Sequence, residues 1–510
     1  MLVEERQRTL RDGSSLMYDT TAWNFSMMYG LPSITVPQHL TKGLSPWTSH
    51  RGTQSIDETA LAWAVSGEDD RSVAFAARLM EQGVNVRIID KATVLSDEAL
   101  PRGTVVVTAM DNPKRDDVVA RVSAEAKTLD VDLVSVGSGY GAGDLPDWGG
   151  AHFRLLSRPQ IAILSQQGFS SYDVGSSWWA IDTHLGIRHS QIDTAYLSRA
   201  DLRRYNTIVM PNGYRPMSSA ETSALKDWVK QGGTLIAHDN SAAQLARDNG
   251  IGQVRSIGDA LDDAQDYDIA LQRERLSTSD ELDTAAVGAH RRDNGIGQVR
   301  SIGDALDDAQ DYDIALQRER LSTSDELDTA AVSANRLSSA VDYPWDQGAK
   351  ALSGDELKRR EAWQKRFMPS GAMVAGKVDT LHWMSFGTPE TLPLLYENQP
   401  VLMTKDRQEA VVRVGVLQED SDAGEAQTVN WSTVPAGSAL TVRMSGLIWP
   451  EAAARIANSA YVTRERVGKG QVILFSGQPN FRGSTRGVGR IWLNALVYGA
   501  GLGTSPNVAL

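Results

Sequence analysis

The 510-residue sequence contains no cysteine. A disulfide, a thiolate zinc ligand and a cysteine nucleophile are therefore excluded. There is also no run of about 18 apolar residues, so the sequence predicts no helix that spans a membrane. The first residues, MLVEERQRTLRDGSS, lack the apolar stretch of a secretory signal. We therefore expect no membrane partner, and a cytoplasmic location if the chain is expressed as written.

Several catalytic signatures are missing as well. The eight histidines form neither an H-E-x-x-H zinc helix nor an H-x-x-E pair. The G-x-S-x-G elbow of α/β-hydrolases and the G-x-x-x-x-G-K-[ST] phosphate loop are both absent. Gly137, Gly139 and Ala142 have the spacing of a dinucleotide loop, but the following GDLPDWGG cannot begin the helix that would hold a pyrophosphate. We interpret that segment as a flexible loop.

The acidic residues are concentrated in an exact repeat. Arg247–Val287 recurs letter for letter at Arg292–Val332, and each copy carries ten acidic residues and four arginines. The two copies therefore account for −12 of the formal net charge of −13, and the rest of the chain is nearly neutral. Solenoid repeats let exposed positions drift, so exact identity indicates a recent duplication or an error of sequence assembly. A net charge of −13 would disfavour nucleic acid if it were spread evenly, and we expect no nucleic-acid partner.

Within each copy, a loose helical pattern predicts an acidic helix. In the first copy its apolar positions are Ile257, Leu261, Ala264, Ile269 and Leu271. The run DDAQDYD lacks the central glycine and the terminal glutamate of an EF-hand, so we do not expect a calcium site.

The remaining chain has the pattern of an α/β protein, because strands alternate with amphipathic helices. We expect helix in ETALAWAV (58–65) and VAFAARLMEQG, followed by a small layer of parallel strands, and a doubly wound sheet with three layers in the next unit. The carboxyl-terminal part is strand-rich, with a hairpin at RVGKGQVILF. The predicted organisation is a packing segment (1–52), a small α/β unit (53–150), a larger α/β domain (151–246 and 337–510) and the duplicated acidic helical insert (247–336).

The best candidate site lies at the carboxyl ends of the strands in the larger domain, where open α/β sheets bind ligands. Three loops converge there in this interpretation: GFSSYDVGSSWW, PNGYRP and HDNSAA. Polar groups mixed with aromatic rings suit a small polar ligand or a peptide end. The candidate residues are Ser170, Asp173, Trp178, Asn212, Tyr214, His238, Asp239 and Asn240. Arg482 is added as a residue that binds an anion or pairs with an acid of the protein itself.

Several sequence segments resemble a known family. They are MYDTTAWNFSMMYGLP, RPQIAILSQQGFSSYDVGSSWWAIDTHLGI, RRYNTIVMPNGY, KDWVKQGGTLIAHDNSA and GKGQVILFSGQPNFRGSTRGVGRIWLNAL. The resemblance is to the long carboxyl-terminal region of large bacterial zinc carboxypeptidases of the carboxypeptidase A type. It implies a flavodoxin-like, class I glutamine amidotransferase-like domain behind a peptidase domain, in a periplasmic or secreted parent protein.

The functional residues of that family do not carry over. The resemblance places the zinc ligands in the preceding peptidase domain, and no position here matches them. The amidotransferase elbow corresponds to TLIAHDNSA, where His238, Asp239 and Asn240 stand and no thioester can form without cysteine. We therefore expect no catalytic residue, no metal site and no cofactor in this chain, with zinc only in the missing peptidase domain, and an internal or truncated start at Met1.

The leading hypothesis is a non-catalytic region that braces the missing carboxypeptidase domain or binds part of its substrate. One rival is an independent hydrolase or transferase that uses Asp239, Asp173 or His238. Another is a binding module for sugars or peptides that uses Trp178, Trp179 and Tyr214.

Overall fold

The computed structural model describes most of the chain outside the acidic repeat. The described residues are 5, 6, 8, 9, 21–33, 45, 52, 56–247, 251–263, 354–404, 410–425, 427–429 and 432–505. They form two compact units. Unit 1 comprises Met1–Trp23, Ala243–Lys377 and Leu394–Glu465, and unit 2 comprises Asn24–Ala242, Val378–Pro393 and Arg466–Leu510. Strands and helices occur in both units, which confirms the predicted α/β class.

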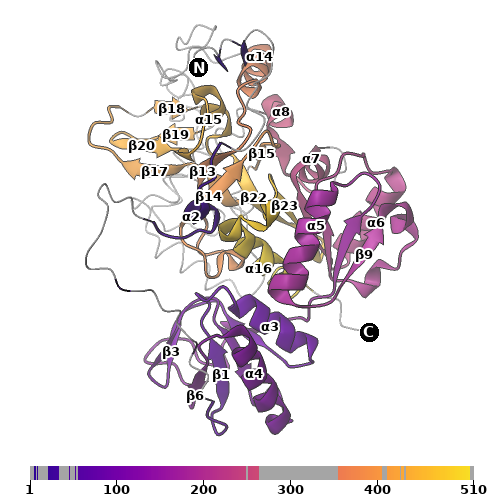
Figure 1. Cartoon of the computed structure of the whole chain (residues 1–510), viewed down its shortest axis with the longest axis vertical. Coiled ribbons are helices and arrows are strands. Elements are labelled where there is room, and N and C mark those ends of the chain that lie inside the picture. Colours follow the sequence, from indigo (N-terminus) through magenta and orange to yellow (C-terminus); the bar gives the residue numbers. More distant parts are fainter. Residues whose placement is uncertain are drawn as a thin grey trace, which may run out of the picture. The chain divides into compact units, whose positions relative to one another are not determined.

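Unit 2 contains a small sheet with the strand order β6-β1-β5-β2-β7. Its strands are β1 (Ala62–Val65), β2 (Arg87–Ile89), β5 (Val105–Thr108), β6 (Val134–Val136) and β7 (Phe153–Leu155). Helix α3 (Ser72–Glu81) follows β1, the short strands β3 (Thr93–Leu95) and β4 (Glu98–Leu100) pair with each other, and α4 (Arg115–Leu129) follows β5. Figure 1 shows these elements in indigo and purple.

Two predictions for this small sheet are wrong. ETALAWAV is not a helix, because its second half forms β1, whose four residues are all buried. A short run of buried apolar residues has no period that separates a strand from a helix. The neighbouring strands are antiparallel, not parallel. Helix α3 does join two parallel strands, β1 and β2, but β5 lies between them in the opposite direction, as in a split βαβ unit.

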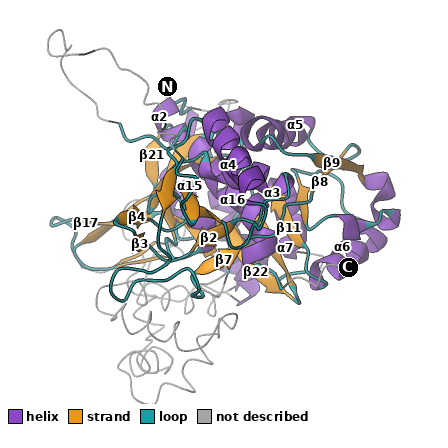
Figure 2. Ribbon diagram, turned by 90° about the horizontal axis from the view of Figure 1, so that it is seen from below, coloured by secondary structure: helices purple, strands orange, loops and turns teal. Residues whose placement is uncertain are grey.

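Unit 2 also contains a layer of five parallel strands in the order β23-β11-β10-β8-β9. They are β8 (Ile161–Ser165), β9 (His189–Asp193), β10 (Thr207–Met210), β11 (Thr234–His238) and β23 (Gly470–Phe475). The helices that follow them are α5 (Ser171–Trp179), α6 (Ser219–Lys230), α7 (Asp239–Arg247) and α16 (Arg486–Leu502). Figures 1 and 2 show α5 and α6 on opposite sides of this parallel layer. Every residue of β8, β10, β11 and β23 is buried, as expected for parallel strands covered on both faces.

Local signals place the ends of these elements. Ser218 and Glu221 form a complete capping box at the start of α6. The chain turns between β22 and β23 at Gly468, whose φ of +61° is in the left-handed region that glycine adopts without a steric penalty. No helix in the described ranges combines the length and the apolar composition needed to cross a bilayer.

Unit 1 contains the predicted strand-rich part. Some of its strands extend past the limits of the unit along the chain. The strands are β12 (Arg255–Ser256), β13 (Ala372–Val378), β14 (Thr391–Tyr396), β15 (Leu402–Met403), β16 (Ala410–Val414), β17 (Val416–Glu419), β18 (Gln427–Val429), β19 (Ser432–Val434), β20 (Ser438–Thr441), β21 (Arg443–Ser445) and β22 (Ala460–Val467). Antiparallel pairs prevail, such as β16 with β22 and β17 with β20. The helices are α8 (Ile257–Ala260), α14 (Gly354–Lys365) and α15 (Pro450–Ile456).

The acidic insert is described only at its beginning. Here β12, α8 and a 3₁₀ turn (Leu261–Asp263) belong to the first copy, and Ile257 and Leu261 of the predicted apolar face are buried. The buried carboxylate of Glu465 accepts hydrogen bonds from the backbone N–H groups of Gln253 and Val254. The start of the first copy is therefore part of the fold of unit 1. The rest of the predicted helix and the whole second copy lie outside the described residues.

Candidate functional site

The candidate site lies at the carboxyl edge of the parallel layer. The loop after β8 and the loop after β10 are joined by two backbone hydrogen bonds, from Ser170 N to Asn212 O (2.8 Å) and from Tyr214 N to Gly168 O (2.6 Å). Since β8 and β10 are neighbouring parallel strands, their loops leave the sheet at the same edge. Helix α7 begins at Asp239, directly after β11, the next strand of the layer.

Asp173 connects these loops from the first turn of α5. The helix is capped by Ser170, whose side chain accepts from the N–H of Asp173. The side chain of Asp173 is 1% exposed. Its Oδ2 accepts a 2.6 Å hydrogen bond from Asn212 N, and Ser176 Oγ lies 3.4 Å from Oδ1. Asp173 is therefore a buried acceptor for protein groups, and it positions the loop after β10.

His238 is the last residue of β11 and is completely buried. Its Nε2 accepts a 2.8 Å hydrogen bond from Trp492 Nε1, which comes from α16. Because an indole N–H only donates, Nε2 carries no proton, and the proton of the ring is on Nδ1. Nδ1 faces Asp173 Oδ2 at 3.4 Å. Both ring nitrogens thus face protein groups in the interior, so His238 cannot act as a general acid or base on a bound molecule.

Asp239 differs from its neighbour in exposure and in backbone conformation. Its φ is +51°, a left-handed value that costs most residues roughly 1–2 kcal/mol and that Asp tolerates better than most. The side chain is half-buried, and its Oδ2 accepts a 3.0 Å hydrogen bond from Asn212 Nδ2. Asn240, which is exposed, donates from Nδ2 to Asn212 Oδ1 at 3.1 Å. A carboxylate and a carboxamide therefore stand together at the surface, held by Asn212.

The hydrogen bonds described so far join Ser170, Asp173, Asn212, His238, Asp239 and Asn240, as the convergence of the three loops predicts. The remaining candidates are placed differently. Trp178 lies near the end of α5 and is 41% exposed, and Tyr214 is 67% exposed. Arg482 lies in the 3₁₀ turn Phe481–Gly483 after β23, with its guanidinium over the ring of Phe481.

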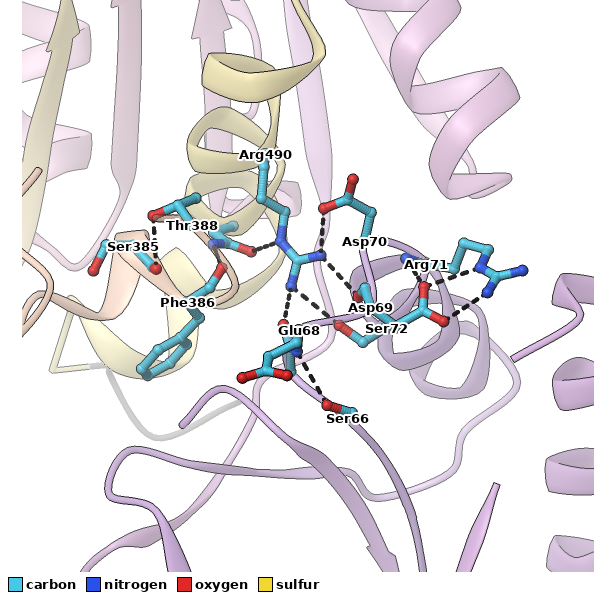
Figure 3. A network of polar contacts seen from close by, with 12 residues as sticks. Ser66, Glu68, Asp69, Asp70, Arg71, Ser72, Ser385, Phe386, Thr388 and Arg490 are labelled. Atoms are coloured by element: carbon cyan, nitrogen blue, oxygen red, sulfur yellow. Dashed lines mark hydrogen bonds and ion pairs between the residues drawn. The ribbon is translucent and has the colours of Figure 1, made fainter. Parts of the chain in front are cut away.

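Two residues of α16 that the sequence did not single out contribute to the interior of unit 2. Trp492 fixes the tautomer of His238 from a position 254 residues away in the sequence. Arg490 is 3% exposed and uses all three nitrogens of its guanidinium, as Figure 3 shows. It donates to Asn494 Oδ1, Asp69 O, Gly67 O and Ser72 Oγ, and it pairs with Asp70. The buried arginine thereby fixes the loop between β1 and α3. No local pattern marks either residue.

His184 has the most strongly shifted histidine pKa among the described residues. It lies in a π-helical turn (Ala180–Leu185) after α5, with its ring edge-on to Trp179 and its Nδ1 2.7 Å from Arg486 Nη1. Burial and the positive charge of Arg486 lower the pKa of His184 to about 4. The ring is therefore neutral near pH 7 and accepts a hydrogen bond from the arginine.

In the part of the chain that the structure describes, no group of three or more His, Asp or Glu side chains is arranged to hold a metal ion. No family model and no curated protein matches the chain. One solved structure, the GH42 beta-galactosidase Gan42B, is 11% identical and has a TM-score of 0.22. The match covers 74% of this chain and 32% of that chain. A TM-score this low supports no argument about the fold or the function.

Proposed function

We propose that the chain is a non-catalytic ligand-binding region, with its site at the carboxyl edge of the parallel layer. Following the family resemblance, the region accompanies a zinc carboxypeptidase-like domain, which it braces or for which it binds part of the substrate. The observation that carries the proposal is the half-buried carboxylate of Asp239, held beside the exposed Asn240 by Asn212. A non-glycine residue with left-handed backbone at a strand-to-helix turn is a reason to look for function there.

The proposal includes a doubly wound, flavodoxin-like topology for the parallel layer. Numbered along the chain, the five strands have the spatial order 2-1-3-4-5, which is the order of flavodoxin-like sheets. Ligands of such sheets bind where the order reverses, between the first and third strands. In this chain those strands are β8 and β10, whose loops Asp173 connects. The position of the polar group thus supports a binding site.

The environment of each acid and base argues against the rival hydrolase. His238 is fully buried and both of its ring nitrogens face protein groups. Asp173 is buried and accepts from Asn212 N. A general base must reach the proton that it removes, within about 3 Å of it or through one water molecule. Of the three, Asp239 alone is half-buried rather than buried, and one carboxylate at the surface is sufficient for binding.

A peptide amino end is the ligand class that this group fits best. The Asp239 carboxylate attracts an ammonium group, and charge-assisted hydrogen bonds are about twice as strong as neutral ones. The Asn240 amide can pair with a peptide group. The exposed rings of Tyr172, in the first turn of α5, and of Tyr214, in the loop after β10, offer apolar surface to side chains of the peptide.

The test is isothermal titration calorimetry with Ala-Ala-Ala and with its N-acetylated form. We expect wild type to bind the free tripeptide and to lose about tenfold in affinity for the acetylated one. Asp239→Asn should bind both equally weakly, because asparagine adopts the left-handed backbone but has no charge. Asp227→Asn, which removes an exposed carboxylate from α6, is the matched control and should behave as wild type.

Two outcomes would contradict the proposal. Equal affinity of wild type for the free and acetylated tripeptides, or binding only of methyl glucoside, would exclude a peptide amino end as the ligand. Release of carboxyl-terminal residues from peptides by the purified chain, abolished by a metal chelator, would show that the region is itself a peptidase.

A further inference from the structure

A second feature of unit 2 is a groove of about 1000 Å³ at the amino edge of the parallel layer. Ile161 and His189, the first residues of β8 and β9 and partners in the sheet, both line it. Because parallel strands share one direction, this edge is opposite to the one that carries Asp239. Residues of α3 and α4 complete the groove. Its volume is at the upper end of the range of roughly 300–1,000 Å³ for small-molecule sites.

Two of the three carboxylates in the groove are already neutralised by the protein. Glu81 pairs with the side chain of Arg188 and also accepts from its backbone N–H at 3.0 Å. Burial alone would raise the pKa of Glu81, but hydrogen bonds from Arg188 and the charges of Arg188 and Arg158 lower it overall. Glu125 accepts from Gln82 at 2.7 Å and lies 3.7 Å from Arg78. These pairs leave the side chain of Asp182, which is exposed, as the remaining acid.

Two of the four arginines in the groove do not pair with these carboxylates. Arg158 and Arg204 are exposed, and neither has an ion-pair partner within 4.0 Å among the residues that the structure describes. Their backbone is nonetheless fixed. Asn206 donates to Arg158 O (2.8 Å) and accepts from Gln160 N (2.8 Å), and Arg204 ends a 3₁₀ turn capped by Asp201. The groove therefore presents two arginines from ordered backbone without a protein anion to bind them.

We propose that this groove binds a small molecule that carries a tetrahedral oxyanion, a phosphate or sulfate ester, through Arg158 and Arg204. The planar guanidinium offers two parallel N–H donors to such an oxyanion, with more geometric specificity than an ammonium group. The rest of the ligand meets neutral polar groups of the lining, Gln160, Ser190 and Tyr205. Asp182 opposes binding of an anion by like-charge repulsion, so the attraction of the two arginines must exceed this repulsion.

The experiment is calorimetric titration with phenyl phosphate, phenyl sulfate and, as the uncharged probe, phenol. We expect both esters to bind and phenol not to bind. The double variant Arg158→Gln/Arg204→Gln should lose at least about tenfold in affinity for the esters. Arg199→Gln/Arg359→Gln is the matched control, because it removes two exposed arginines that do not line the groove. That control should lose less than about twofold in affinity for the esters, because it removes only the long-range attraction between two positive charges and the ester.

Further variants separate this proposal from the one above. Asp182→Asn should tighten ester binding, because it removes the repelling carboxylate. Asp239→Asn should leave ester binding unchanged. The proposal for the groove and the proposal for the site at Asp239 can therefore fail independently of each other. Tighter binding of phenyl phosphate than of phenyl sulfate would identify phosphate esters as the ligand class, and equal binding would support the shared oxyanion chemistry. No binding of either ester to wild type, or equal losses in the two double variants, would overturn the proposal.

Discussion

The two edges of the parallel layer use their charged and polar groups in different ways. At the carboxyl edge, His238 and Asp173 are buried and bind protein groups, whereas Asp239 is half-buried and Asn240 and Tyr214 are exposed. At the amino edge, charged side chains line an open groove, where Glu81 pairs with Arg188 and Glu125 with Arg78, whereas Arg158 and Arg204 have no ion-pair partner among the described residues. The carboxyl edge therefore offers one carboxylate to a ligand, whereas the amino edge offers two guanidinium groups.

This difference shows that residue type alone does not identify a functional group. A buried donor or acceptor without a partner costs roughly 1–3 kcal/mol. Buried polar groups are therefore hydrogen-bonded to other groups of the protein. The groups that remain for ligands are those at the surface whose backbone is fixed. In our proposals Asp239 and Arg158 bind ligands, and the buried His238 does not.

The largest expected effect concerns Arg490, a buried arginine that contrasts with those of the amino edge. Arg490→Met should lower the free energy of unfolding by about 3 kcal/mol, because it leaves buried carbonyl groups of the loop between β1 and α3 without a donor. Chemical denaturation measures this loss. Arg203→Met is the control, since Arg203 is an exposed residue paired with Asp201, and its effect should stay within about 1 kcal/mol. Similar losses in both variants would contradict the assignment of Arg490 as a buried structural residue.

A smaller effect is expected from the pair His238 and Trp492 at the carboxyl edge. His238→Phe and Trp492→Phe should each cost about 2 kcal/mol in the free energy of unfolding, because each leaves a buried partner without its hydrogen bond. The double variant should lose less than the sum of the single losses, since it removes both partners of that bond. Neither variant that folds should change the affinity for Ala-Ala-Ala. Additive losses would contradict a direct bond between the two rings.

The effect that is smallest near neutral pH is a dependence of stability on pH, which arises from His184. The segment from α5 to the π-helical turn that contains His184 leads from the carboxyl edge to the start of β9 at the amino edge. The pKa of His184 in the folded protein is lowered from 6.5 to about 4, so the unfolded chain takes up the proton first as the pH falls. Stability should be unaffected above pH 6.5 and should decrease from there toward pH 4.

His184→Gln isolates this contribution in urea denaturation experiments at a series of pH values. The variant should show a weaker decrease in stability over the same interval, because glutamine does not titrate. Acids with lowered pKa values, such as Asp111 and Glu221, lower the stability of the folded state only at more acidic pH. They do so equally in wild type and in His184→Gln. Identical curves for wild type and His184→Gln would contradict the role of His184.

Much of unit 2 can be predicted from the sequence because its signals are local. Buried strands such as TLIAH are followed by loops and capped helices, and loops of neighbouring parallel strands must converge at one edge. Strand direction in the small sheet could not be predicted, because the alternating pattern does not say which strand inserts between β1 and β2. The tautomer of His238 and the contacts of Arg490 depend on α16, which lies more than 200 residues further along the chain.

The role of Asp239 is the central claim, and one titration tests it most directly. Ala-Ala-Ala is titrated into wild type and into Asp239→Asn under identical conditions. We expect the wild type to bind at least about tenfold more tightly, because asparagine keeps the backbone conformation and removes only the charge. Equal affinity of the two proteins would contradict the account and would leave Asp239, like Asp173, as a residue that only stabilises the fold.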